Sequence, residues 1–62
     1  MENIKLHDGT EKQFEVLENE DCKFYFCETH DDAVSLSMTL TDLGNVCLID
    51  KGASSWYVMV RK

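Results

Sequence analysis

The sequence contains no proline and only three glycines, so few residues interrupt regular structure. It starts without a basic segment followed by an apolar one, and we expect no signal peptide. No apolar run approaches the roughly 20 residues that cross a bilayer. Its three cysteines, an odd number, make a poor disulfide framework. We therefore expect a cytoplasmic protein, or one in the host cytoplasm if the gene is viral.

Positive charge is also scarce, because six basic residues stand against twelve acidic ones and give a net charge of −6. Such a chain is repelled by nucleic-acid phosphates and by anionic membranes, and it is attracted to basic surfaces. Solubility alone is another explanation of the same net charge. We therefore expect a larger protein with a basic surface as the partner, and neither nucleic acid nor a membrane.

What is present is typical of a folded domain, with 44% apolar and 29% charged residues. A chain of 62 residues predicts one domain, spanning residues 1–62, that buries about 60% of its unfolded surface. A core of this size leaves little room for a cofactor pocket, which needs roughly 300 Å³ or more. We expect no cofactor.

Residues 3–17 alternate like a β-hairpin around the Asp8-Gly9 turn signal. A three-residue loop over 8–10 would pair Ile4 with Phe14 and bring the apolar residues of both strands onto one face. Gly9 would then supply a positive φ at a bulge. Residues 22–27 follow as a strand, because they are rich in aromatic residues.

Residues 29–43 have the features of a helix, with Thr29 as N-cap and Gly44 just after the end. One stripe at helical spacing holds its apolar residues, namely Ala33, Leu36, Leu40 and Leu43. Residues 45–61 then predict a second hairpin with strands at 46–49 and 56–60. The order β-β-β-α-β-β predicts an α+β fold, a single antiparallel sheet of four to five strands with one helix on one face.

Alternation divides the strand residues between a face under the helix and an open face. The expected inner face is Ile4, Leu6, Phe14, Val16, Cys22, Phe24, Phe26, Val46, Leu48, Trp56, Val58 and Val60. The open face is unusually apolar for one that meets water, which is typical of a contact surface. The expected partner-binding residues on it are Leu17, Tyr25, Ile49, Tyr57, Met59 and Arg61. If the alternate residues of one strand were assigned to the wrong faces, the expected open face would also be apolar.

The residues that carry chemistry do not converge. Cys22 and Cys27 are an odd number of positions apart in one expected strand and face opposite sides, so we expect no metal site. His30, Asp31 and Asp32 are consecutive and point in different directions, and acids at a helix start favour the helix dipole. There is no glycine-rich phosphate loop and no nucleophile motif. We expect no enzyme and no catalytic residues.

The string Glu28-Thr29-x-Asp31-x-Ala33-x-x-Leu36 follows an expected strand and covers about a sixth of the chain. It resembles the start of the helix in the small bacteriophage inhibitors of bacterial RNA polymerase, as does any capped amphipathic helix after a strand. The strand-helix-glycine-strand-strand order is also similar to that of the peptidoglycan-binding SPOR domain, whose flanking pattern is missing here. Neither resemblance transfers a functional residue.

The leading hypothesis is a small acidic non-catalytic interaction protein, an inhibitor or regulator of the phage or mobile-element type on a basic, nucleic-acid-binding surface. The acids expected to cluster at one end of the sheet and contact this partner are Glu15, Glu18, Glu20, Asp21, Glu28, Asp31 and Asp32. One alternative is a homodimeric accessory protein that pairs through the open face. Another is a single-stranded nucleic-acid binder that stacks bases on Tyr25 and Tyr57, beside Lys23 and Arg61.

Overall fold

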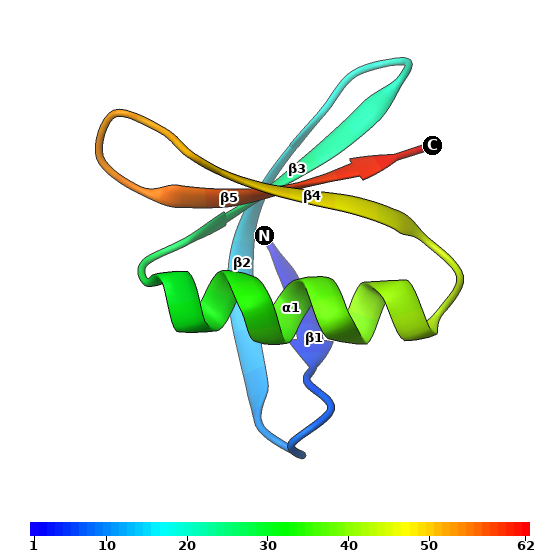
Figure 1. Cartoon of the computed structure of the whole chain (residues 1–62), viewed down its shortest axis with the longest axis vertical. Coiled ribbons are helices and arrows are strands. Elements are labelled where there is room, and N and C mark those ends of the chain that lie inside the picture. Colours follow the sequence, from blue (N-terminus) through cyan, green and yellow to red (C-terminus); the bar gives the residue numbers. More distant parts are fainter.

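The computed structural model describes all 62 residues and contains five strands and one helix. In chain order these are β1 (Glu2–Lys5), β2 (Glu11–Glu18), β3 (Cys22–Cys27), α1 (His30–Asp42), β4 (Val46–Lys51) and β5 (Trp56–Arg61). The strands form one antiparallel sheet in the order β1-β2-β3-β5-β4, and α1 lies across one face of it (Figure 1). The predicted α+β class is confirmed.

The strand order shows how the helix connects the two halves of the sheet. β5 pairs antiparallel with both β3 and β4, so β3 and β4 run parallel with β5 between them. α1 provides the crossover between these two parallel strands. β2 is shared in a different way, because its first half pairs with β1 and its second half with β3. β2 is therefore paired along one edge in its first half and along the other edge in its second half.

The first hairpin turns through His7-Asp8-Gly9. The Leu6 amide donates to the Thr10 carbonyl at 2.7 Å and the Gly9 amide donates to the Leu6 carbonyl at 2.9 Å. Gly9 has a φ of 90°, which side chains with a Cβ rarely adopt. The expectations of a three-residue loop and of a positive φ at Gly9 are confirmed.

The predicted register of this hairpin is wrong by two residues. Ile4 lies opposite Lys12, not Phe14, because the loop begins one residue earlier than expected. A shift of two residues keeps every side chain on its face. Leu6 and Phe14 are accordingly both buried in the core, as the alternation predicted.

The helix begins and ends where the sequence predicts. The Thr29 hydroxyl accepts a hydrogen bond from the Asp32 amide at 3.1 Å, so one free amide of the first turn is satisfied. At the other end Gly44 has a φ of 95°, and the Asn45 amide donates to the Leu40 carbonyl at 3.1 Å. These are the features of a glycine-terminated Schellman motif.

The core lies between α1 and the sheet. Its buried residues are Leu6, Phe14, Tyr25, Cys27, Ala33, Leu36, Leu40, Val58 and Val60. Leu43, predicted on the buried stripe of the helix, is 74% exposed, because it is the C-cap residue and the helix has already ended. Thr39 joins the helix to the first hairpin, since its hydroxyl accepts from the His7 amide at 3.0 Å.

Candidate functional site

Three rows of side chains run across the strands on the face that α1 does not cover. The central row is Leu17, Phe24, Met59 and Leu48. The acidic row is Glu15, Phe26, Tyr57 and Asp50. The arginine row is Cys22, Arg61 and Val46. Since the residues of a row lie directly opposite one another in register, each row is a continuous line of neighbours.

Most of this surface is apolar. We call it the open apolar face, and it consists of Leu17, Phe24, Phe26, Val46, Leu48, Tyr57 and Met59. Leu17, Val46 and Leu48 are 59%, 68% and 55% exposed. The ring of Tyr57 lies edge-on to Phe24 with centroids 5.9 Å apart, and 6.3 Å from Phe26. A contiguous aromatic and aliphatic patch of this kind is typical of a contact surface.

The predicted membership of this face is partly wrong. Leu17, Tyr57 and Met59 belong to it and Arg61 lies beside it in the arginine row. Tyr25 and Ile49 instead pack against the core under the helix.

The error has one cause, because the parity of two strands is reversed. Residues predicted to face the helix that are instead on the open face are Cys22, Phe24, Phe26, Val46 and Leu48. Both alternate sets of residues in β3 and β4 are apolar, so alternation alone does not distinguish their two faces.

The same correction removes the geometric basis of the nucleic-acid hypothesis. Tyr25 is only 4% exposed, and its hydroxyl donates to Glu2 at 3.2 Å. Tyr57 is on the opposite face of the sheet, where its hydroxyl donates to Asp50 at 3.3 Å. Two rings on opposite faces cannot form one stacking platform.

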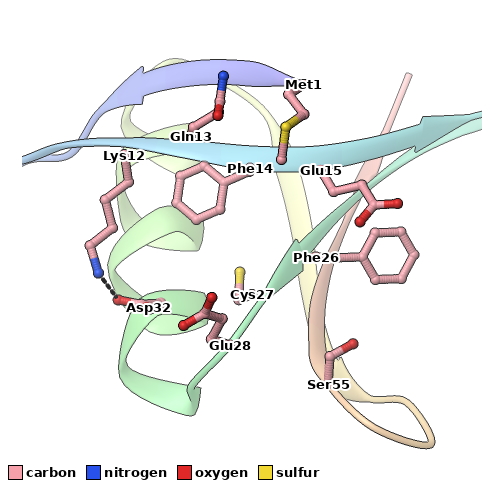
Figure 2. A pocket seen from close by; sticks show the side chains of 10 residues that line it. All are labelled: Met1, Lys12, Gln13, Phe14, Glu15, Phe26, Cys27, Glu28, Asp32 and Ser55. Carbon is pink, nitrogen blue, oxygen red and sulfur yellow. Dashed lines mark hydrogen bonds and ion pairs between the residues drawn. The ribbon is translucent and has the colours of Figure 1, made fainter.

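A groove of about 460 Å³ opens where β2 diverges from β3, at the end of the sheet beside the start of the helix (Figure 2). Its lining residues come from three elements and the nearby loops, and they are Met1, Lys12, Gln13, Phe14, Glu15, Phe26, Cys27, Glu28, Asp32 and Ser55. Figure 2 shows the ring of Phe14 and the sulfur of Cys27 between the Lys12–Asp32 pair on one side and Glu15 with Phe26 on the other. The groove therefore combines apolar walls with carboxylates.

One carboxylate of the groove already binds a cation from the same chain. The Lys12 ammonium is 2.6 Å from Asp32, and this ion pair raises the pKa of Lys12. Glu15 and Glu28 have no basic side chain within 4 Å. The groove can thus accept a further positive charge.

Cys27 lines the groove as a buried thiol. Its burial raises the pKa of the thiol from 9.0 to about 11, with Asp32 adding to the effect. Below pH 9 its thiolate fraction is then lower than that of an ordinary cysteine by a factor of about 100.

We expect iodoacetamide at mildly alkaline pH to modify Cys22 and Cys47, which are half-buried, well before the buried Cys27. Peptide mass spectrometry of a time course measures the three rates separately. Alkylation of Cys27 should accelerate up to about pH 11, as its thiol ionises. A Cys27 rate equal to that of Cys22 would contradict the burial described here.

The cysteines do not come together. Cys22 is on the open face and Cys27 faces the helix, as their odd separation predicts. The expected burial is reversed, since Cys27 is buried and Cys22 is only half-buried. Cys47 lies opposite Val60 and Cys27 opposite Trp56, so these two are not cross-strand neighbours.

The predicted single acidic cluster is wrong, because its members divide between the two ends of β3. Glu18 ends β2, and Glu20 and Asp21 follow it in the β2–β3 turn. Lys62 pairs with Glu18 at 2.7 Å and lowers the pKa of that carboxyl. The acids at the other end, beside the helix start, are Glu15, Glu28, Asp31 and Asp32. β3 spans roughly 17 Å at the usual rise per residue, so the two groups act separately.

No protein-family model, curated protein sequence or solved structure matches this chain. α1 is neither long enough nor apolar enough to span a bilayer. The features that bear on function are therefore the open apolar face, the groove with its carboxylates and the distribution of charge.

Proposed function

We propose that this chain is a non-catalytic interaction protein that binds a basic surface of a larger protein through the acid-lined groove. In its sharper form it is an inhibitor or regulator, of the type that phages and mobile elements encode, which occupies a nucleic-acid-binding surface. The observation that carries the proposal is the convergence of Glu15, Glu28 and Asp32 around the apolar walls of one groove.

The groove suits the side chain of a lysine or an arginine. The half-buried ring of Phe26 offers apolar surface to a methylene stem, while Glu15 and Glu28 offer carboxylates to its charged end. The Lys12–Asp32 pair is an internal example of the same contact. The groove has a volume of about 460 Å³, which is large enough for such a side chain. It is also open to the surface, so a partner can insert the side chain into it.

The rest of the charge supports the approach of a basic partner. Three ion pairs use three of the six basic residues, and nine of the twelve carboxylates have no basic side chain within 4 Å. An excess of unpaired negative charge accelerates association with a basic surface and disfavours acidic competitors. Occupation of a surface that binds phosphates would exclude nucleic acid from it.

The test compares two double variants that remove the same charge. Glu15→Gln with Glu28→Gln neutralises the groove, and Glu20→Gln with Asp21→Asn neutralises the β2–β3 turn at the other end of β3. Proteins that the wild-type chain captures from cell lysate at low salt are identified, purified and titrated by calorimetry against all three forms. We expect the groove variant to bind about tenfold more weakly or worse, and the turn variant to bind within about threefold of wild type.

Equal losses in the two variants would show that net charge alone drives binding, and would refute the groove as the contact site. Binding that does not weaken as salt rises would refute a basic partner, because charge pairing between surfaces is screened by ions.

A further inference from the structure

The open apolar face is uncovered in a protein whose own core is small. Ten of 62 residues are buried, and only Leu36 and Val58 among the large side chains are completely so. Domains of this size obtain little net stability from their own core, and many gain the rest by association. The face and the core are two sides of the same sheet, so a cover on the open apolar face would stabilise the fold as a whole.

Charge is arranged on this face in a way that a second copy can match. The central row has no charge, the arginine row on one side of it carries Arg61, and the acidic row on the other side carries Glu15 and Asp50. A two-fold axis along the central row would lay the arginine row of each copy on the acidic row of the other. Central rows would then meet each other, apolar against apolar.

The same axis places particular groups together. β5 of one copy would cross over β5 of the second, so that Arg61 would lie above the ring of Tyr57. Asp50 is on the neighbouring strand beside Tyr57 and is held there by the tyrosine hydroxyl at 3.3 Å. A guanidinium over an aromatic ring, with a carboxylate next to it, is a favourable arrangement.

We infer that the open apolar face is the interface of a homodimer, in which two sheets pack face to face about this axis. Antiparallel alignment of strands across the axis agrees with the usual packing of two sheets, whose strand directions differ by about 30°. The pairing is isologous, so one patch serves both copies. Glu28 and the Lys12–Asp32 pair lie on the helix side of the groove (Figure 2) and stay outside the interface.

The size of the face indicates a dimer of modest affinity. Four strands and three rows cover roughly 20 Å by 20 Å at standard spacings, which is at the small end of specific interfaces. Most of the chain's acids are in the turns and the helix, away from the face, so their mutual repulsion is largely screened at physiological salt. We expect a micromolar dissociation constant.

The test is sedimentation velocity of the full chain from low micromolar to millimolar concentration. We expect a mass that rises from 7.1 kDa to twice that value. Met59→Asp, in the central row, should abolish the dimer, whereas Met38→Asp should leave it intact because Met38 is a half-exposed residue of the helix. Circular dichroism of both variants shows that they are folded. A wild-type chain that stays monomeric at millimolar concentration would overturn the inference and leave the face to a different protein.

The orientation of the two copies has a separate test. Arg61→Glu and Asp50→Arg should each weaken the dimer at least tenfold, because each places like charges together. The double variant exchanges the two charges, and we expect it to recover affinity to within about threefold of wild type. A double variant weaker than either single one would overturn the proposed axis. The groove shares Glu15 and Phe26 with this surface, whereas Glu28 and the Lys12–Asp32 pair lie outside it. Sedimentation of the chain alone tests the dimer whether or not the groove binds a basic partner.

Discussion

Leu36→Ala is expected to unfold a large part of the protein at room temperature. Leu36 is completely buried at the middle of α1, where it packs against the sheet. Truncation of such a leucine costs about 2–5 kcal/mol, because the cavity that it leaves closes only in part. A domain of this length has a net stability of about 3–5 kcal/mol, so one substitution removes most of it.

Thermal unfolding followed by circular dichroism measures this effect. We expect the midpoint of Leu36→Ala to fall by about 15 °C or more, since each kcal/mol shifts a domain of this size by about 4–8 °C. Met38→Ala is the matched control, because Met38 is on the same helix and 50% exposed. A midpoint for Leu36→Ala within a few degrees of the control would contradict the packing described here.

The parts of the fold that were predictable from sequence are those that local chemistry determines. Thr29 and Gly44 specify the ends of the helix, because a hydroxyl N-cap and a glycine with positive φ each solve a local hydrogen-bonding problem. The three-residue loop at Gly9 was predictable for the same reason. In these places a few adjacent residues decide the structure.

Strand parity was predictable only where one face is clearly polar. Phe14 lies between the polar residues Gln13 and Glu15 in β2, and it faces the core as expected. In β3 and β4 both sets of alternate residues are apolar, so parity depends on the loops that set the register. The loops 19–22 and 52–55 each have four residues between paired positions, whereas the predicted inner face requires an odd number in each. Each even loop moves every side chain of one strand to the other face.

The groove could not be predicted from the sequence, because its residues come from separate elements. Its carboxylates come from β2, from the residue that follows β3 and from α1, and they meet beside the point where β2 changes partner. Nothing local in the sequence marks that change. The charge of the chain indicated an acidic contact, but the tertiary structure decides which acids share a site.

Tyr25→Asp and Phe24→Asp are neighbouring substitutions with opposite expected outcomes. Tyr25 is 4% exposed beneath the helix, so an aspartate there leaves a buried carboxylate without a partner and costs more than about 3 kcal/mol. That cost is close to the whole stability of the domain, and we expect Tyr25→Asp to be unfolded. Phe24 is on the open apolar face, and Phe24→Asp should remain folded with a loss of about 1 kcal/mol.

Proton–nitrogen correlation spectra at low micromolar concentration distinguish the two outcomes, because a folded chain shows dispersed amide signals and an unfolded one does not. Amide dispersion reports folding whether the wild-type chain is monomeric or dimeric, so loss of the dimer in Phe24→Asp does not enter the comparison. The opposite result, an unfolded Phe24→Asp with a folded Tyr25→Asp, would restore the parity expected from the sequence and return Phe24 to the core. The open apolar face and the dimer that we infer from it both require the parity seen in the structure, so this pair of variants tests the premise on which they depend.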